Sequence, residues 1–289
     1  MKWKRLTIAT LIFVSILVFV AWFAGAILTA PIPREIGKLP QDLSGMSVDF
    51  RSESGSQIHG WLIPGQGGRG LVIIMHGVRA SRLDMLGRAR FLSRAGYAVL
   101  LFDFQAHGES PGQQITFGYL ESRDARAALA FARSVSPHEK IGVIGVSMGG
   151  AAALLAEPPL SIDGLVVEQV YPTMHDAISD RISMRWGAWS RALTPLLSWQ
   201  LRPRLGVSDR DLRPLDHVRK IICPKLFVGG ESDRHTTPKE LRRMFDAAAE
   251  PKELWIVPQA KHVDLSRFAK GDYERRILSF FSKHLSATP

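Results

Sequence analysis

The motif Gly145-Val146-Ser147-Met148-Gly149 constrains this chain more than any other feature of its sequence. The apolar run 141–146 predicts a buried strand, and the alanine-rich run 151–156 after the motif predicts a helix. A strand, a sharp turn that carries a serine, and a helix together form a nucleophile elbow. Such a turn strains the backbone at the serine, and the flanking glycines leave out side chains that would collide there. Ser147 is therefore the candidate nucleophile; the alternative is a glycine-rich turn without a chemical role.

The rest of the chain alternates between apolar and amphipathic segments. Strands are predicted over 46–50, 57–63, 71–75, 97–102, 165–167, 226–230 and 254–257, and helices over 83–94, 119–132, 238–249 and 273–285. The first two strands are predicted to form a hairpin. The alternation as a whole predicts βαβ units and a mostly parallel sheet, with ligand-binding groups at the carboxyl ends of the strands. His76, Asp103, Ser147 and Glu168 all fall at such ends.

Residues 171–214 interrupt this alternation. The segment is rich in Trp, Arg, Met and Pro and shows no strand pattern. We interpret it as a short helical cap inserted over the carboxyl edge of the sheet. The alternative is a set of surface helices that do not contact a substrate.

The first 30 residues are predicted to form a membrane anchor. Residues 6–30 carry no charge, and a helix of this length spans roughly 37 Å, more than the ~30 Å hydrocarbon core of a bilayer. Lys2, Lys4 and Arg5 favour a cytoplasmic N-terminus, which puts the remaining chain outside the cytoplasm, periplasmic or extracellular. The alternative is a signal peptide cleaved near Ala26 or Ala30, which would make the protein secreted. Residues 31–45 are predicted as a linker and 46–289 as one α/β domain.

Composition excludes several classes of site. The chain has 289 residues and a single cysteine, Cys223, which excludes an internal disulfide framework and a cysteine-based zinc site. Cys223 precedes a proline and an apolar run and is predicted to be a buried thiol. The net charge is +10, but the basic residues are scattered, so nucleic-acid binding is not expected. No metal or organic cofactor is implied.

Taken in order, the motifs resemble the α/β-hydrolase fold superfamily over roughly residues 46–286. The resemblance depends on His76-Gly77, the segment 103–110, the motif 145–149, Gly230-x-x-Asp233 and a late His262. More narrowly, the chain resembles membrane-anchored or secreted serine hydrolases related to the prolyl-oligopeptidase-like esterases. The family places its catalytic residues in the order serine, acid, histidine, which implies Ser147, Asp233 and His262.

The chemistry of such a site gives each residue a role. His262 would take the proton of Ser147, and Asp233 would orient His262. The backbone N–H groups of Met148 and Val78 would form the oxyanion hole.

Several other residues are alternatives or have supporting roles. Glu168 is the main alternative acid, and Glu231 and Asp216 are weaker ones. His76, Asp103 and His107 are expected to shape the loop after residue 77. Arg79 either meets a substrate carboxylate or faces solvent.

The sequence therefore predicts a serine hydrolase that cleaves carboxylic esters through an acyl-enzyme, acting on a small-molecule or lipid-like ester. A peptidase or amidase and a lipase for membrane lipids are alternatives with the same triad. An alternative of another class is a non-catalytic, membrane-tethered binding scaffold. Removal of residues 1–33 is expected to spare hydrolysis of soluble short-chain esters and to lower activity on bilayer substrates.

Overall fold

A single eight-stranded sheet organises the molecule. The computed structural model describes residues 2–286. The strands lie in the order β10-β9-β8-β7-β4-β5-β3-β2, and only β3 runs antiparallel to its neighbours. Their bounds are β2 (Met46–Arg51), β3 (Gln57–Ile63), β4 (Leu71–Met75), β5 (Ala98–Phe102), β7 (Ile141–Val146), β8 (Gly164–Glu168), β9 (Lys225–Gly230) and β10 (Lys252–Val257). The mostly parallel sheet and the β2–β3 hairpin predicted from the sequence are confirmed.

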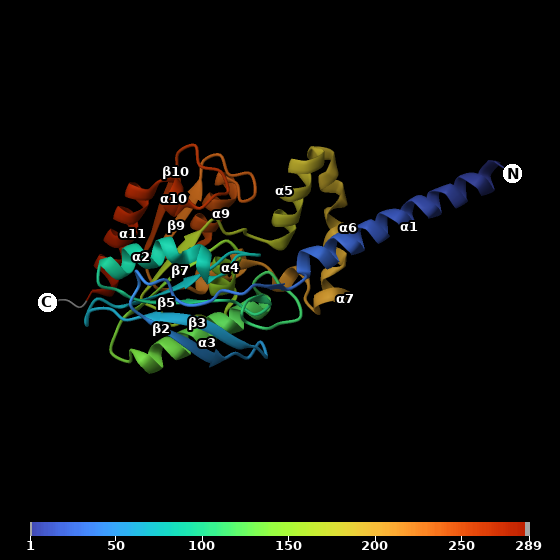
Figure 1. Ribbon diagram of the computed structural model, residues 1–289. Helices are drawn as coiled ribbons and strands as arrows, with labels where there is room; N and C mark the ends of the chain where they lie inside the picture. Colours follow the sequence, from blue (N-terminus) through green and yellow to red (C-terminus); the bar gives the residue numbers. More distant parts are fainter. Residues whose placement is uncertain (1, 287–289) are drawn as a thin grey trace.

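Helices cover both faces of this sheet, and each face has its own apolar core (Figure 1). Alternate residues of β4 show the division: Val72 and Ile74 belong to one core, and Ile73 and Met75 to the other. The first core is covered by α2 (Leu86–Arg94), α10 (Leu265–Phe268) and α11 (Lys270–Leu285). The second is covered by α3 (Tyr119–Val135), α4 (Met148–Leu155) and α9 (Pro238–Ala247). With both faces buried, the inner strands β4, β5 and β7 are continuously apolar, as their sequences predicted, whereas the edge strands β2 and β10 alternate with exposed polar residues.

Helix boundaries differ slightly from the prediction. The helix expected over 83–94 begins as a 3-10 turn, η1 (Arg82–Met85), and α9 ends two residues early at Ala247. The start of α9 is fixed by Thr237, whose hydroxyl accepts the N–H of Glu240 in a capping box. These differences do not move any predicted site residue to another element.

The segment predicted as a cap is helical. It contains α5 (Met174–Trp186), η2 (Ala188–Leu193), α6 (Thr194–Trp199), α7 (Leu201–Leu205) and η3 (Asp209–Asp211), followed by α8 (Pro214–His217) and η4 (Val218–Lys220). Helices α5 to α7 stand apart from the sheet, next to the end of α1 (Figure 1). The cap and the end of α1 therefore lie side by side at the same end of the domain.

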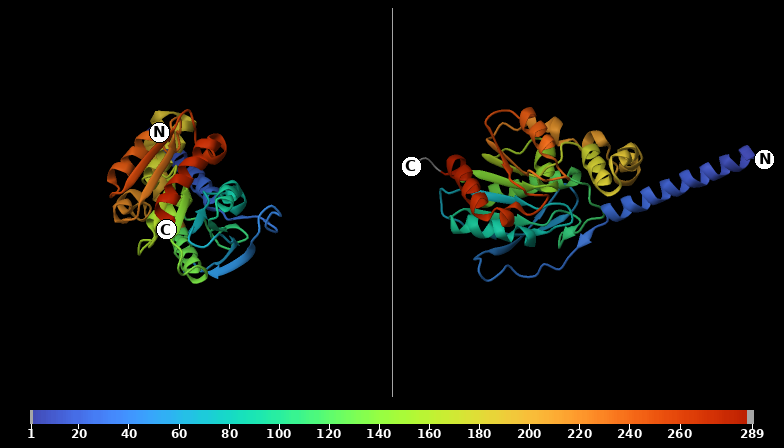
Figure 2. Two further views of the ribbon diagram at one scale, coloured as in Figure 1. Left: turned by 90° about the vertical axis from the view of Figure 1, so that its left-hand side faces the viewer. Right: turned by 90° about the horizontal axis from the view of Figure 1, so that it is seen from above.

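The N-terminal helix α1 (Lys2–Thr29) projects away from the domain, as Figure 2 shows from above. Its residues Trp3–Thr29 are long and apolar enough to cross a membrane, with a mean hydropathy of 2.7, a property that signal sequences share. Beyond it, β1 (Ile32–Pro33) pairs in parallel with β6 (His107–Gly108). The segment predicted as a linker is thus attached to the domain at its start.

Candidate active site

Ser147 lies at a strained turn between β7 and α4. Its backbone has φ 51° and ψ −113°, a conformation that non-glycine residues rarely adopt. A Cβ at position 149 would lie 2.4 Å from the carbonyl oxygen of Met75, and one at Gly145 would lie 2.5 Å from the Cα of Gly150. The predicted strand, strained serine and helix are therefore present, and the flanking glycines are required by close backbone contacts.

Asp233 and His262 come together from two neighbouring strand ends. Asp233 follows β9 and His262 follows β10, the strand paired with it. Nδ1 of His262 donates a hydrogen bond to Oδ2 of Asp233 at 2.8 Å. The imidazole is thereby oriented by a carboxylate, with its Nε2 directed away from Asp233.

Asp233 is held as a carboxylate by several donors. Its side chain is buried, and it also accepts the backbone N–H groups of His235 and Thr236, the Thr236 hydroxyl and the side-chain amide of Gln169. Burial raises the pKa of Asp233, but the hydrogen bond and charge of His262 and the Thr236 hydrogen bonds outweigh it, so the pKa is lowered. Asp233 is therefore an acceptor for His262.

Ser147 and His262 line the same cavity. We call it the polar cavity for the charged side chains on its wall, such as Asp84 and Arg181. It has a volume of about 470 Å³, and Gly77, Val78 and Gln169 also line it. The structure thus gathers the three residues predicted from the family order at one place, on the carboxyl edge of the sheet.

The loop after β4 lies beside Ser147 on the wall of the same cavity. The N–H of Ala80 donates to the carbonyl oxygen of Gly77 at 3.3 Å, and Arg79 has φ 60°, as in a type II turn. Such a turn does not use the N–H of its second residue, Val78, which lines the polar cavity with Ser147. The geometry is compatible with Val78 as an oxyanion donor beside Met148 at the start of α4.

Buried polar side chains fix this loop, as predicted. His76 contacts the carbonyl oxygen of Gly77 at 2.7 Å through Nδ1, and its Nε2 accepts the N–H of Phe104 at 3.1 Å. Nε2 of His107 accepts the N–H of Arg79 at 3.1 Å, and Asp103 accepts the N–H of Arg82 at 2.7 Å. The guanidinium of Arg79 donates to a backbone carbonyl at the end of α1, that of Ile27.

His76 should make stability depend on pH. Burial, with the charge of His107 added, lowers the pKa of His76 to about 3. Between pH 6.5 and 3 the unfolded chain therefore binds a proton that the folded chain does not, so stability falls as the pH falls. At about 1.4 kcal/mol per pH unit, this residue costs about 2 kcal/mol at pH 5.

We expect His76→Gln, which keeps a donor and an acceptor, to remove this dependence. From pH 7 to pH 5, the unfolding free energy of the wild type should fall by about 2 kcal/mol more than that of the variant. Chemical denaturation at both pH values measures this difference. A constant difference across this range would contradict a neutral His76.

Sequence reasoning missed Gln169, the residue directly after β8. It has φ 51°, and its amide nitrogen donates to Asp233 Oδ2 and to the carbonyl oxygen of Lys261, both at 3.0 Å. One side chain thus connects the acid to the loop that carries His262. Its position at the carboxyl end of a predicted strand, directly after Glu168, was the only feature of the sequence that could have indicated a role in the site.

Glu168, the alternative acid, serves a different network. Its carboxylate is fully buried and pairs with Arg88 Nη2 at 2.7 Å, and it also accepts a hydrogen bond from the Tyr273 hydroxyl. Arg88 in turn pairs with Asp264 at 2.9 Å, two residues after His262. The network connects α2, β8, α11 and the histidine loop, and Asp233 is the acid that contacts His262.

We expect Arg88→Met to lower the unfolding free energy by about 3–5 kcal/mol, because Glu168 would keep a buried charge without its cation. Thermal unfolding of the full chain in detergent should show a fall in Tm on the order of 10 °C. The matched double variant Arg88→Met, Glu168→Gln leaves no such charge and should recover part of the loss. A double variant less stable than Arg88→Met would contradict this account.

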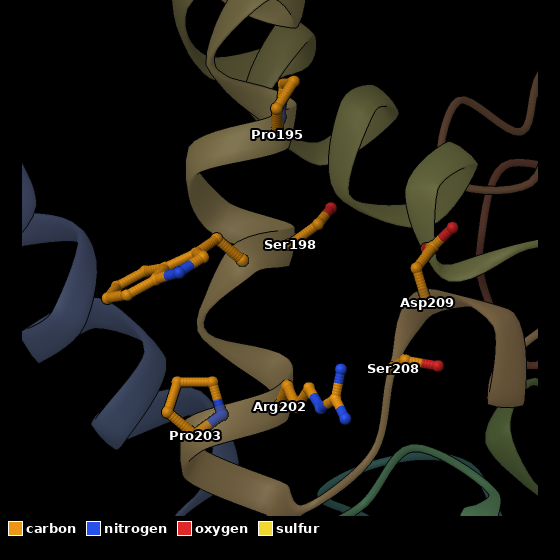
Figure 3. A pocket seen from close by; sticks show the side chains of 7 residues that line it. Pro195, Ser198, Arg202, Pro203, Ser208 and Asp209 are labelled. Atoms are coloured by element: carbon orange, nitrogen blue, oxygen red, sulfur yellow. The ribbon is translucent and has the colours of Figure 1, made fainter.

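A second cavity adjoins Ser147 on the side of the cap. This apolar cavity has a volume of about 290 Å³ and is lined by Ser147, Met148, cap residues and the end of α1. A wider hollow of about 760 Å³ lies on the cap, and Ser198, Arg202 and Asp209 are on its wall (Figure 3). None of its lining residues also lines either cavity at Ser147. We therefore confine the candidate site to the two cavities that meet at Ser147.

Cys223 is buried, as predicted, and burial raises the pKa of its thiol to about 11. Within residues 2–286, no three or more His, Cys, Asp and Glu side chains are grouped so that they could hold a metal ion.

Comparison with known proteins identifies a hydrolase family model, related sequences and a similar fold. A family model described as serine aminopeptidase, S33 matches residues 66–212, a little over half of the chain. The Bacillus subtilis protein YqkD is 24% identical over 241 residues, covering 82% of this chain and 79% of YqkD. The Mycobacterium tuberculosis protein Rv2307c is 28% identical over 243 residues, covering 81% and 77%. Among solved structures, the Pyrococcus furiosus esterase Pf2001 has a similar fold, with a TM-score of 0.74 at 24% identity over 89% of this chain and 99% of the esterase.

Proposed function

Because this chain belongs to the serine aminopeptidase S33 family, we propose that it is a serine hydrolase that cleaves carboxylic esters. The family is one of the α/β hydrolases, the superfamily that the motifs of the sequence predicted. The observation that carries this proposal is the hydrogen bond between His262 and Asp233 beside the cavity that His262 shares with Ser147. Among the solved structures with a similar fold, the Pyrococcus furiosus protein is named an esterase.

The proposed reaction has two halves. Ser147 Oγ attacks the ester carbonyl carbon while Nε2 of His262 takes its proton, and Asp233 stabilises the imidazolium. The N–H groups of Val78 and Met148 stabilise the oxyanion. The bond to the alcohol oxygen then breaks, His262 returns the proton to that oxygen, and an acyl-enzyme remains. Water activated by His262 releases the acid and restores Ser147.

Two observations favour an ester over the N-terminus of a peptide. An aminopeptidase needs a carboxylate available to bind the substrate ammonium group. Of the two aspartates on the wall of the polar cavity, Asp264 is paired with Arg88 and Arg267, and Asp84 already accepts the N–H and hydroxyl of Ser81 through Oδ2. The apolar cavity on the other side of Ser147 suits an acyl group.

We place α1 as an uncleaved membrane anchor. Lys4 and Arg5 at its start support a cytoplasmic N-terminus, with the hydrolase domain outside the cytoplasm. Gln200 and Arg204 donate hydrogen bonds to the carbonyl oxygens of Ala21 and Trp22 in α1. These bonds support its retention, since cleavage near Ala26 or Ala30 would remove both.

The test uses the full chain in detergent, a fluorophosphonate probe, p-nitrophenyl butyrate and leucine p-nitroanilide. We expect one adduct on the peptide that contains Ser147, loss of turnover after labelling, and a higher kcat/KM for the ester than for the anilide. An adduct at another residue would overturn the assignment of Ser147. A preference for the anilide would support the peptidase, and folded protein with neither labelling nor turnover would support the binding scaffold.

A further inference from the structure

The last turns of α1 form a wall of the apolar cavity at Ser147. Ala24, Gly25, Leu28 and Thr29 line it from α1, opposite side chains of the cap such as Ile178 and Leu201. The candidate membrane anchor is therefore also part of the candidate active site.

Specific contacts hold α1 in this position. The amide of Gln200 donates to the carbonyl oxygen of Ala21 at 3.1 Å, and the Arg204 guanidinium donates to that of Trp22 and lies 4.1 Å from the centre of the Trp22 ring. A Cβ at position 25 would lie 1.9 Å from Gln200 Oε1, so glycine permits the close approach of α1 to the cap. At its end, the carbonyl oxygen of Thr29 accepts the N–H of Ile115 at 2.8 Å.

The preceding part of α1 has the length of a membrane span. Residues 3–20 are exposed or half-buried, and as a helix these 18 residues extend roughly 27 Å, close to the ~30 Å hydrocarbon core. A bilayer around this part would end at the cap. The ring centroids of Trp22 and Trp199 lie 6.3 Å apart there, and Trp186 and Trp189 on the cap are also exposed. Tryptophan is enriched at membrane interfaces.

The two cavities at Ser147 differ in the chemistry of their walls. Ser147, Val78 and Arg181 line both, so an ester carbonyl at Ser147 lies where the cavities meet. The cavity beside His262 has both acidic and basic side chains on its wall. The cavity beside α1 has three arginines, Arg79, Arg181 and Arg204, but most of its lining residues are apolar. An acyl chain fits the second and an alcohol group the first. A methylene takes about the space of a water molecule, about 30 Å³, so about 290 Å³ holds one chain on the order of ten carbons.

The apolar cavity reaches the surface along α1. Leu28 lines the cavity and is nevertheless 54% exposed, and Leu197 and Arg204 on the facing cap helices are half-buried. A chain that enters here passes between α1 and the cap, at the depth where the bilayer ends. Since α1 continues from this opening into the membrane, the opening faces lipid.

We propose that the substrate is an acyl ester of the membrane itself, whose chain enters the apolar cavity from the bilayer between α1 and the cap. The inference depends on the proposed function, because it names the substrate class of the same site. It assigns α1 a role in substrate binding besides anchorage. Removal of residues 1–33 would then take away one wall of the apolar cavity and lower the hydrolysis of soluble esters as well. The sequence alone led us to expect that hydrolysis of soluble short-chain esters would survive this removal.

The first test compares two variants of the full chain reconstituted in phosphatidylcholine vesicles. Ala24→Trp fills the cavity from α1, and Phe23→Trp adds the same side chain at an exposed neighbouring position that does not line it. We expect Ala24→Trp to lower kcat/KM for p-nitrophenyl decanoate about tenfold or more and that for p-nitrophenyl acetate less than about threefold. Phe23→Trp should change neither by more than about threefold.

The outcomes separate the inference from the proposed function. Equal losses on both esters, or no loss on either, would overturn the acyl site while leaving the hydrolase intact. Wild-type protein that hydrolyses neither ester would overturn the function, and the inference with it.

The second test distinguishes entry from the bilayer from entry through water. Didecanoylglycerol, a two-chain lipid, is placed in the same vesicles as the protein or in separate protein-free vesicles mixed with them. We expect hydrolysis in the shared vesicles and about tenfold slower hydrolysis in the mixture, because the lipid must first cross water. Equal rates, or hydrolysis in neither preparation, would overturn entry from the bilayer.

Discussion

Ser147→Ala and His262→Ala are each expected to lower kcat for a soluble ester by roughly 10⁴-fold or more, and the double variant is expected to lose no more than either single one. The reason is that the two groups act as a unit. Without its base, the serine hydroxyl remains a weak nucleophile, and without the nucleophile the base has no proton to take. The activity that remains in all three variants should be similar and should come from the oxyanion donors and substrate binding.

The measurement is steady-state hydrolysis of p-nitrophenyl butyrate by the full chain in detergent, which gives kcat directly. Ser232→Ala is the matched control, since Ser232 is an exposed serine beside Asp233 and lines neither cavity at Ser147. It should keep activity within about threefold of wild type. Losses that multiply in the double variant would show that Ser147 and His262 act independently, and the proposed mechanism would then be wrong.

The sequence predicted the sheet and the elbow well because both depend on local information. Residues 140–156 contain the strand, the turn and the helix of the elbow within one continuous stretch. Asp233 and His262 were located by family order, and their strands β9 and β10 are neighbours in the sheet, which brings the two loops together. No pattern in the sequence measures the distance between them.

The contacts that the sequence could not predict join distant segments. Arg88 pairs with Glu168, which lies 80 positions away, and Gln200 binds α1 from 179 positions away. The apolar pattern of residues 6–30 predicts a helix that favours lipid, but it does not predict which protein surface the end of that helix contacts. For this reason the sequence separated the anchor from the catalytic domain, whereas the structure places the last turns of α1 beside Ser147.

Asp233→Asn is expected to lower kcat by roughly 10³- to 10⁴-fold with little change in KM. In the wild type, the carboxylate can only accept, so His262 carries its proton on Nδ1 and presents an unprotonated Nε2 to the cavity. An asparagine NH₂ group directed at His262 would favour the other tautomer, with the proton on Nε2. Such a histidine cannot take the proton of Ser147.

Thr236→Val is the matched control for Asp233→Asn, because the Thr236 side chain also donates a hydrogen bond to Asp233. The Thr236 hydroxyl donates to the same oxygen as His262, Oδ2, at 2.8 Å, so this variant removes a donor and keeps the charge. We expect it to lower kcat less than about tenfold, because the carboxylate still accepts from His262 and from the Gln169 amide. Both variants should be compared with Glu168→Gln, whose network stabilises the fold. A larger loss of kcat at Glu168 than at Asp233, in proteins of equal Tm, would move the catalytic acid to β8.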